Sequence, residues 1–506
     1  MKYKNPIISG FHPDPSIVRT GEDYYLVTSS FEYFPGLPVF HSKDLVNWEQ
    51  ISHCITRNEQ MTFVKDEPNS MGLYAPTLRY HEGTYYVICT NVAYGRRAAN
   101  VQGGNFIVKT DNPAGEWSDP VWIDTPGIDP SLFWDEDGRV YLSGSSNGIY
   151  LCQVNPDTGE LLGELQYIWK GSGGSNPEGP HIYKKDGWYY LLISEGGTEY
   201  CHMVTMARSR QITGPYESYE KNPVLTNRSL DTTIKAVGHA DLVEDINGNW
   251  WAVCLGIRPL DYPFHHNLGR ETMLVPVKWD AGEWPEFGEH GMLQEEIETD
   301  KLTAMQIQLK GIIHDEFEQS SLELYWNHIY NPDPETFSLS KEGLILYGNE
   351  NGLSSKDSVA WIGRRQEHID CTARTQIHFT RRQDGETAGI TIYMNNRHHY
   401  EAALTQIDDK GYIIFSRRIG SLWKVEKQIP YNKDQVILEL HCSKESYSFW
   451  YGETTDELKF LGKGEADYLT TEVGGKFTGN YIGLYATGNG NKCKEGAIFN
   501  WFEYQV

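Results

Sequence analysis

An internal repeat constrains the fold of this chain more than any other feature of its sequence. Each copy has a short apolar segment, a polar turn that contains glycine, and a strand rich in aromatic residues, which is the pattern of a β-hairpin. The copies begin at Asp14, Ala75, Asp129, Glu178 and His239. Hairpin repeats of about 50 to 60 residues are typical of β-propeller blades with four strands each. The repeat therefore predicts an all-β fold with a five-bladed β-propeller over residues 1–293.

A different strand pattern follows the repeat. Residues 294–313 contain no further copy and are largely polar, so we interpret them as a connection between domains. Residues 314–506 hold short runs of alternating apolar and polar residues, such as 375–379 and 389–393, separated by turn signals. This spacing favours a β-sandwich as the second domain.

The charge balance excludes several classes of partner. The 506 residues include 44 Lys plus Arg and 69 Asp plus Glu, which give a formal net charge of −25. A surface this acidic repels phosphate backbones and anionic lipid headgroups, and no local basic stripe offsets it. We therefore expect no nucleic-acid partner and no membrane partner, and a neutral or cationic small ligand instead.

No segment of the sequence indicates export or membrane insertion. The first residues lack the apolar core of a signal peptide, and no run approaches ~20 apolar residues. The eight cysteines are scattered, with no close pairs and no zinc-type spacing. We therefore expect a cytoplasmic protein whose cysteines are free thiols.

The starts of the repeat units carry the residues that suggest chemistry. The innermost strands of propeller blades surround one axis, so equivalent positions in different blades converge. Three acids, Asp14, Asp129 and Glu178, and also His239 stand at these positions, although alignment on the following proline places Gly179 opposite Asp14. Like charges that lie close together raise the pKa of at least one acid. Two carboxyls with separated pKa values can act as general acid and general base, as glycoside hydrolysis requires.

Aromatic and polar residues near the repeat starts suit a sugar ligand. Sugars offer apolar C–H faces and hydroxyl rims, so aromatic side chains with polar neighbours bind them. Phe31, Tyr33 and Phe34 follow the first hairpin, Tyr74 precedes the second unit, and Arg270 follows the fifth. We expect Phe31, Tyr74 and Arg270 to contact the substrate.

Several longer motifs support a resemblance to a known family. They are GFHPDPS at 10–16, FEYFPG at 31–36, HSKDLVNW at 41–48, DPSLF at 129–133, EGPH at 178–181, EGGT at 195–198, GHA at 238–240 and LGRET at 268–272. Together they resemble glycoside hydrolase family 43, the β-xylosidase and α-L-arabinofuranosidase group, and the resemblance covers nearly the whole chain. It implies a five-bladed propeller followed by a concanavalin-like β-sandwich.

The resemblance implies a role for each matching residue. Asp14 would be the general base that activates water, Glu178 the general acid, and Asp129 the residue that tunes and orients that acid. Arg270 and Thr198 would bind the terminal sugar. Members of the family invert the anomeric configuration, which requires a gap of roughly 6.5–9.5 Å between the two carboxyls.

Three features of the site stay open at this level. Some family members hold a divalent cation, often calcium, near the histidine that matches His239, and the alternative is a neutral histidine hydrogen-bonded to water. Such an ion would tune the pocket without activating water, so the chemistry requires no cofactor. The resemblance also implies that Phe477, in the loop 474–479, comes from the sandwich as a lid over the active site. Tyr74 stands where close xylosidases usually have Trp, which leaves the choice between xylose and arabinose open.

The sequence therefore predicts an inverting exo-glycosidase that releases D-xylose from the non-reducing end of xylo-oligosaccharides and also acts on α-L-arabinofuranosides. A predominantly α-L-arabinofuranosidase activity is the alternative. A non-catalytic sugar-binding propeller would not require acids at three blade starts. A retaining fructan hydrolase would show a different motif at its start, and an endo-arabinanase would need an open groove. A homo-oligomer is compatible with the sequence.

Overall fold

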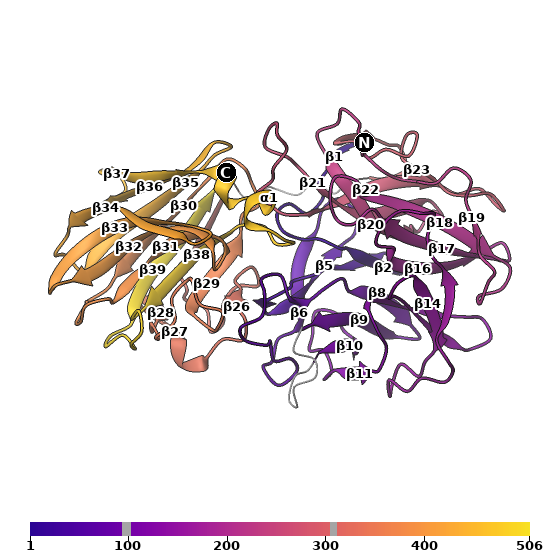
Figure 1. The fold of residues 1–506 in the computed structure, drawn as a ribbon, viewed down its shortest axis with the longest axis horizontal. Helices are drawn as coiled ribbons and strands as arrows, with labels where there is room; N and C mark the ends of the chain where they lie inside the picture. Colours follow the sequence, from indigo (N-terminus) through magenta and orange to yellow (C-terminus); the bar gives the residue numbers. More distant parts are fainter. Residues whose placement is uncertain (94–102, 304–310) are drawn as a thin grey trace. The chain divides into compact units, whose positions relative to one another are not determined.

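The chain forms two compact units in a computed structural model that describes residues 1–93, 103–303 and 311–506 (Figure 1). The first unit consists of Met1–Val64, Met71–Pro259 and Arg270–Ile307, and the second of Lys65–Ser70, Leu260–Gly269 and Gln308–Val506. Two short segments from the region of the repeat thus belong to the second unit. The boundaries 1–293, 294–313 and 314–506 stay a prediction, and residues 304–310 of the connection lie outside the described residues.

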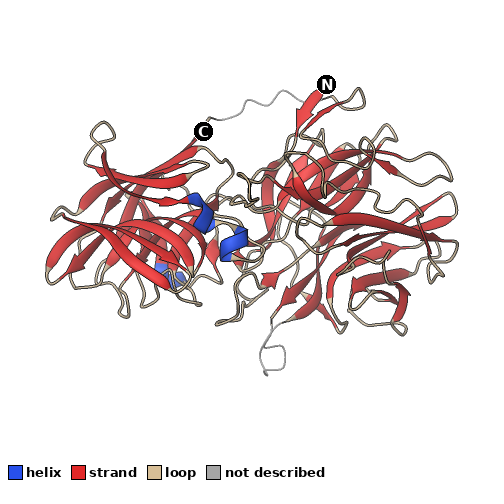
Figure 2. Cartoon of the chain, turned by 45° about the horizontal axis from the view of Figure 1, so that its top comes forward, coloured by secondary structure: helices blue, strands red, loops and turns tan. Residues whose placement is uncertain are grey.

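The regular structure is almost entirely β-sheet, as the repeat predicted (Figure 2). Helical segments in the described parts of the chain are short and lie in the second unit. They are η1 (Pro334–Thr336), η2 (Ala466–Leu469) and α1 (Thr471–Gly474). Among the residues described, no helix has the length and apolar character needed to cross a membrane.

Each of the five repeat units lies in its own antiparallel sheet of the first unit. The first sheet has β2 (Ser16–Thr20), β3 (Asp23–Val27), β5 (Gly36–Ser42) and β6 (Glu49–Ile55), and the second has β7 (Gly72–Leu73), β8 (Thr77–His81), β9 (Thr84–Val92), β10 (Gly104–Thr110) and β11 (Val121–Ile123). The third has β12 (Ile128–Trp134), β13 (Val140–Ser145), β14 (Ile149–Gln153) and β15 (Gln166–Trp169). The fourth has β16 (Glu178–Lys185), β17 (Trp188–Glu195), β18 (Met203–Ser209) and β19 (Glu217–Ser218). The fifth has β20 (Lys235–Glu244), β21 (Trp250–Ile257), β22 (Glu271–Lys278) and β23 (Glu286–Phe287).

One strand from each of these sheets contacts the corresponding strands of its neighbours in a closed cycle. Strand β2 contacts β8, β8 contacts β12, β12 contacts β16, β16 contacts β20, and β20 contacts β2 again. Apolar side chains pack between neighbouring sheets, and one such cluster joins Leu26 of the first sheet to Val253 of the fifth. The N-terminus supports this closure, because Ile8 pairs with Thr272 of β22, and β1 (Lys2–Lys4) pairs with β24 (Glu296–Glu298). A short strand, β4 (Tyr33–Phe34), completes the elements of this unit.

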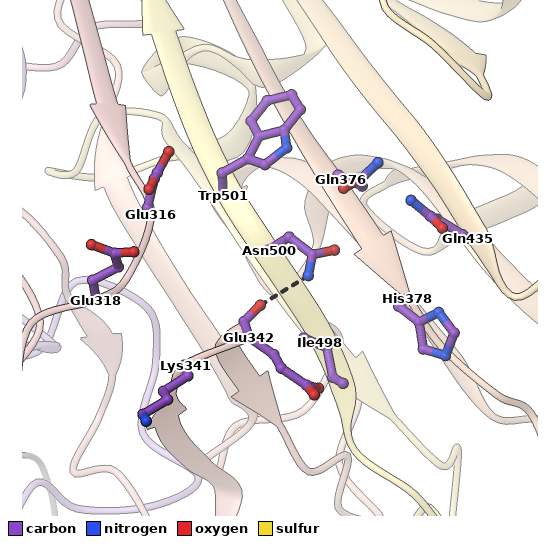
Figure 3. Close-up of a pocket in the computed structure, with 10 residues that line it drawn as sticks. All are labelled: Glu316, Glu318, Lys341, Glu342, Gln376, His378, Gln435, Ile498, Asn500 and Trp501. Atoms are coloured by element: carbon purple, nitrogen blue, oxygen red, sulfur yellow. Dashed lines mark hydrogen bonds between the residues drawn. The ribbon is translucent and has the colours of Figure 1, made fainter.

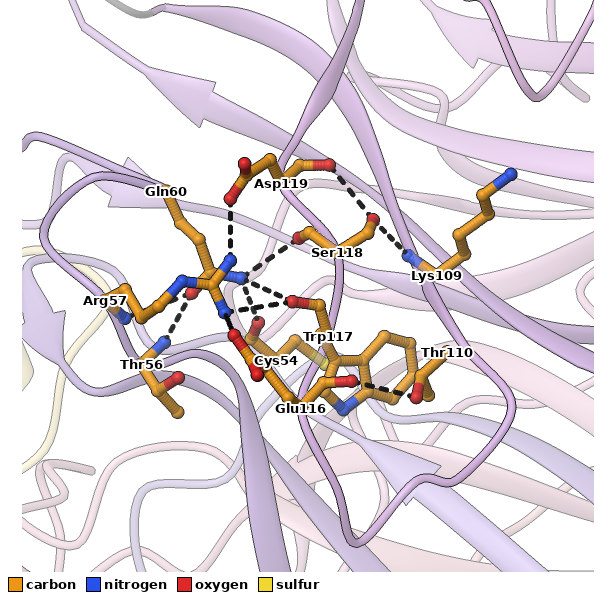
Figure 4. A network of polar contacts seen from close by, with 10 residues as sticks. All are labelled: Cys54, Thr56, Arg57, Gln60, Lys109, Thr110, Glu116, Trp117, Ser118 and Asp119. Atoms are coloured by element: carbon orange, nitrogen blue, oxygen red, sulfur yellow. Dashed lines mark hydrogen bonds and ion pairs between the residues drawn. The ribbon is translucent and has the colours of Figure 1, made fainter.

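Hydrogen bonds and ion pairs connect the loop after the first sheet to the loop between β10 and β11 (Figure 4). Arg57 pairs with Glu116 and, through Nη2 at 2.6 Å, with Oδ1 of Asp119. The buried amide of Gln60 accepts from the N–H of Arg57 at 3.0 Å and donates to the carbonyl of Trp117 at 3.1 Å. These bonds satisfy backbone groups of two loops at once, which orders the outer end of the contact between neighbouring sheets.

A second buried polar network joins the five strands β2, β8, β12, β16 and β20. Ser16 on β2 donates to Asp241 on β20 at 2.6 Å, and Arg79 on β8 donates to the same carboxylate at 2.8 Å. Nη2 of Arg79 also lies 2.9 Å from Nδ1 of His181 on β16, and Oγ of Ser131 on β12 lies 3.1 Å from that nitrogen. Ser16, Arg79 and Tyr183 bind the buried Asp241 carboxylate from three different sheets, so the network holds these sheets in register.

The buried ring of His181 predicts a loss of stability in acid. Burial, with the nearby Arg79 charge, lowers the pKa of His181 to about 3. The unfolded chain therefore takes up a proton below about pH 6.5 that the folded chain takes up only near pH 3, and the free energy of unfolding falls across this window. We expect His181→Asn to reduce this pH slope by up to about 1.4 kcal/mol per pH unit.

Urea unfolding at pH values between 7 and 4.5 measures that slope. The matched control is His290→Asn, because His290 is exposed and the same chemical change is made outside the core. An equal slope in wild type and His181→Asn would show that His181 does not contribute to acid sensitivity.

The second unit consists of two antiparallel sheets, which agrees with the predicted sandwich. One sheet contains β25 (Ile312–Asp315), β27 (Phe337–Ser340), β28 (Gly343–Leu346), β30 (Cys371–His378), β35 (Gln435–Cys442), β36 (Ser446–Gly452), β37 (Lys459–Glu465) and β39 (Ala497–Gln505). The other contains β29 (Ala360–Arg365), β31 (Thr387–Asn395), β32 (His398–Ile407), β33 (Lys410–Ile419), β34 (Leu422–Pro430) and β38 (Tyr481–Thr487), and β26 (His328–Ile329) is a further short strand. Alternating residues of both sheets form one apolar core that includes Leu438 and Ile390. All eight cysteines of the chain are free thiols.

Candidate active site

Backbone geometry repeats at the starts of the sheets. Asp14 (φ 55°), Asp129 (φ 55°), Gly179 (φ 59°) and His239 (φ 51°) all have the left-handed conformation. In β12, β16 and β20 the strand register also shifts at this point, as in a β-bulge. Such strain in residues other than glycine clusters at functional sites, because surrounding contacts must hold it. Gly179 is therefore the structural equivalent of Asp14, and Glu178 is offset by one residue, as the proline alignment indicated.

Asp14 lies in a buried position between two donors. Its Oδ1 accepts a hydrogen bond from Nη1 of Arg270 at 2.8 Å, and its Oδ2 accepts one from Oγ of Ser29 at 2.6 Å. Nδ1 of His239 lies 3.6 Å from Oδ1. Burial by itself would raise the pKa of Asp14, but the charge of Arg270 and the neighbouring His239 outweigh it, so the pKa is lowered. Asp14 is thus an ionised carboxylate at neutral pH and can accept a proton.

Asp129 has the opposite environment. It is buried on β12, and its Oδ2 accepts a hydrogen bond from the backbone N–H of Gly179 at 3.1 Å. Burial, followed by the charges of Glu178 and Asp14, raises the pKa of Asp129 well above its usual range. The like charges act because the carboxyls lie close together. This satisfies the expectation that clustering raises the pKa of at least one acid.

Glu178 is the most accessible of the three acids. Its side chain is 18% exposed, whereas that of Asp14 is 5% exposed. It begins β16, directly before Gly179, whose backbone N–H donates a hydrogen bond to Asp129. Its Oε1 lies 3.5 Å from Nε2 of His202. A partly exposed acid beside a buried one can reach a ligand that the buried one cannot.

His239 lies among these acids, and its backbone N–H donates to Oγ of Ser194 at 2.6 Å. Burial lowers the pKa of His239, although the charges of Asp14 and Glu178 oppose this shift. The ring is therefore neutral. Calcium takes six to eight oxygen ligands, and in the part of the chain that the structure describes, no group of three or more His, Cys, Asp or Glu side chains is arranged to hold a metal ion. A calcium ion near His239, bound directly or through water, therefore stays a prediction.

The predicted sugar-binding residues of the first unit also meet around Asp14. Nη1 of Arg270 lies 3.2 Å from Oγ1 of Thr198, and the guanidinium lies 5.6 Å from the centre of the Phe31 ring. The rings of Phe31 and Tyr74 are 5.0 Å apart at 52°. The structure thus brings together a cation, a hydroxyl and two aromatic rings beside an ionised carboxylate, which is a suitable lining for a sugar.

Phe477 belongs to the second unit. It is half-buried, and its backbone N–H donates to Oγ of Ser70, in a segment of the same unit, at 3.2 Å. Its assignment as a lid stays a prediction.

Sequence reasoning missed three residues of the site, namely Ser29, Ser194 and His202. Ser29 lies two residues after the aromatic strand β3, and Ser194 lies near the end of the aromatic strand β17, so a small hydroxyl residue there could have been noticed as a recurring feature. His202 has no such signal, because it precedes β18 and is far in sequence from the strands that it contacts.

The second unit carries an open groove of about 600 Å³, which is an alternative place for a catalytic site (Figure 3). Trp501, Gln376 and Gln435 line it, together with three carboxylates. These carboxylates, Glu316, Glu318 and Glu342, are all exposed, so water screens them and no desolvated acid–base pair forms there. The chemistry is therefore expected in the first unit.

Two family models match the chain. The model described as glycosyl hydrolases family 43 matches residues 3–285, and the model of the beta xylosidase C-terminal concanavalin A-like domain matches residues 314–505. The second match agrees with the expected type of sandwich.

Similar proteins span the full length of the chain. The non-reducing end alpha-L-arabinofuranosidase BoGH43B of Bacteroides ovatus is 40% identical over 99% of this chain and 94% of its own. A beta-xylosidase of Bacillus subtilis is 32% identical, with 100% of both chains covered. The solved structure of xylan beta-1,4-xylosidase from Bacillus halodurans C-125 superposes with a TM-score of 0.92 at 32% identity, also over 100% of both chains.

Proposed function

The chain belongs to glycosyl hydrolases family 43, and on that premise we propose that it is an inverting exo-glycosidase that releases D-xylose from the non-reducing end of xylo-oligosaccharides. We further propose that the five sheets of the first unit are the blades of a five-bladed propeller. The closed cycle of contacts from β2 through β8, β12, β16 and β20 supports this count.

One observation carries the proposed chemistry: neighbouring acids have opposite environments. Arg270 lowers the pKa of Asp14, whereas burial and the charges of Glu178 and Asp14 raise that of Asp129. Separated pKa values among clustered acids are the requirement for paired acid and base catalysis.

In the proposed reaction, Asp14 accepts a proton from water as the water oxygen attacks the anomeric carbon. The glycosidic C–O bond breaks, and Glu178 gives its proton to the leaving oxygen. The charge of Glu178 contributes to the raised pKa of Asp129, so the two carboxyls interact strongly enough to share the proton that Glu178 delivers in this proposal. Arg270 has two tasks here: it keeps Asp14 ionised, and it offers donors to sugar hydroxyls.

The stereochemistry of the product tests this proposal. In ¹H NMR of early hydrolysis of xylobiose or an aryl β-xyloside, we expect the released xylose to appear first as the α-anomer and to mutarotate afterwards. First appearance of the β-anomer would indicate a retaining mechanism, and absence of free xylose would exclude the proposed activity.

A predominantly α-L-arabinofuranosidase activity is the second candidate. The 40% identical relative from Bacteroides ovatus is named for that activity, and Tyr74 gives the wall beside Phe31 a hydroxyl. Initial rates on aryl β-xyloside and aryl α-L-arabinofuranoside distinguish the two candidates. The same rates measured with a chelator test the proposed cation near His239, since removal of the cation is expected to slow hydrolysis of both substrates.

We also keep the proposal that Phe477 contributes to sugar binding. Phe477→Ala is expected to raise KM for xylobiose about tenfold or more, because an aromatic contact with a sugar ring is lost. The control is Val473→Ala, since Val473 is 48% exposed on α1 of the same unit. Equal KM values for wild type and Phe477→Ala would exclude the contact.

A further inference from the structure

His202 is a fully buried histidine whose two ring nitrogens have different surroundings. Nδ1 lies 3.3 Å from the backbone carbonyl of Ala236. A carbonyl can only accept, so Nδ1 carries the hydrogen. In the neutral ring, Nε2 then has a lone pair, and no described residue donates a hydrogen bond to it. The nearest acid oxygen is Oε1 of Glu178, at 3.5 Å.

The position of this ring is tightly determined. A Cβ atom on Gly238 would lie 2.3 Å from the ring carbon Cε1, so the imidazole packs directly against the glycine backbone. The backbone N–H of His202 donates to the carbonyl of Glu199 at 2.9 Å, and its carbonyl accepts from Oγ1 of Thr226 at 2.9 Å. The backbone of His202 is thus held on both sides while its ring packs against Gly238, which keeps the imidazole beside Glu178.

We propose that His202 is a positioning residue for the catalytic acid: its Nε2 accepts a hydrogen bond from the protonated carboxyl of Glu178, and so favours and orients the proton-bearing form. This inference rests on the proposed function, because it gives Glu178 the role of proton donor. A lone pair facing a carboxyl stabilises the neutral acid, whereas a second N–H at that position would stabilise the carboxylate.

Other groups also act on Glu178, so the contribution of His202 must be separated from theirs. Asp129 on β12 and His239 on β20 both interact electrostatically with Glu178. Neither of them offers a lone pair that is held in place by a backbone carbonyl at the opposite edge of the ring. His202 is thus the neighbour that can select the orientation of the proton as well as its presence.

Two substitutions test the roles of the two ring nitrogens of His202 separately. His202→Asn keeps an amide donor near the position of Nδ1 and removes the acceptor near Glu178. His202→Gln can place its amide oxygen near the position of Nε2 and loses the donor to Ala236. If His202 acts through Glu178, His202→Asn lowers kcat/KM and His202→Gln is tolerated. If His202 only fills space or anchors Ala236, His202→Gln is the more harmful of the two substitutions.

The experiment measures pH profiles of kcat/KM for xylobiose and for an activated aryl xyloside with the full chain. The alkaline limb reports the acid of the free enzyme. We expect His202→Asn to lower the alkaline pKa by about one unit and to slow xylobiose about tenfold near pH 8, with a smaller loss on the activated substrate. His202→Gln is expected to show the same alkaline limb of the pH profile as the wild type.

Each result decides the proposal. An alkaline limb that does not move or moves upward in His202→Asn overturns it, as does an equal loss in the Asn and Gln variants. If His202→Asn does not fold, the Gln variant alone decides, since loss of the wild-type limb in a folded Gln variant also overturns the proposal. A wild type that lacks glycosidase activity would instead refute the proposed function, so the two failures are distinguishable.

Discussion

Replacement of Asp14 by Ala is expected to lower kcat/KM for xylobiose by about 10²- to 10⁴-fold, the range typical of a general base. Arg270 and Ser29 hold this carboxylate at 2.8 and 2.6 Å, and Arg270 contributes to its low pKa. Without the carboxylate, the attacking water loses its proposed proton acceptor. The acidic limb of the pH profile, which reports the ionisation of this base, is expected to disappear with it.

Azide provides a specific control for Asp14→Ala. It needs no general base, and it can enter the space of the missing carboxylate, where Arg270 offers a positive charge. With an activated aryl β-xyloside we expect azide to restore turnover and to give the α-xylosyl azide. The matched control variant is Asp137→Ala, because Asp137 lies in the turn between β12 and β13 with its side chain 48% exposed. Wild-type turnover in Asp14→Ala would reject the assigned role.

The Glu178→Gln variant is expected to show a loss that depends on the leaving group. Gln keeps the shape of the side chain but cannot donate an acidic proton. Xylobiose, whose leaving alkoxide needs protonation, is expected to slow by about 10²- to 10⁴-fold, whereas a dinitrophenyl xyloside should be affected far less. The alkaline limb of the pH profile should also flatten for the residual activity, since the titrating proton donor is gone.

Steady-state kinetics on a series of aryl xylosides measure this dependence. The slope of log kcat/KM against the pKa of the leaving phenol should become steeper in the variant than in wild type. The control is Glu164→Gln, because Glu164 is an exposed glutamate between β14 and β15 of the neighbouring sheet. An equal loss on good and poor leaving groups would mean that Glu178 binds or orders the site but does not donate the proton.

Part of this site could be predicted from the repeat, because equivalent positions in repeat units occupy equivalent places in their sheets. Asp14, Asp129 and His239 have the same place in their units, and the structure gives all three the same left-handed backbone. Ala75 marks the limit of that reasoning, because it starts a unit but does not share this conformation in the described geometry. A pattern of residue types predicts which strand a residue begins, whereas φ depends on the bulge that the neighbouring strands impose.

Other parts could not be read from any local pattern. The bond between Arg270 and Asp14 joins residues 256 positions apart, and the contact of His202 with Glu178 has no sequence periodicity behind it. The assignment of 65–70 and 260–269 to the second unit is of the same kind. Such contacts depend on how loops of different sheets pack, and many loop sequences satisfy the same hairpin pattern.

The sequence by itself determined the all-β class, the five repeat units and the acids that open three of them, because alternation and turn residues act over a few neighbouring positions. Only the tertiary structure decided the charge state of each acid: Asp14 meets a guanidinium and a hydroxyl, while Asp129 meets like charges in a buried place. The physical reason is that a pKa reflects the field and solvation at one point in space. Residues from distant parts of the chain create that field only after the sheets have packed.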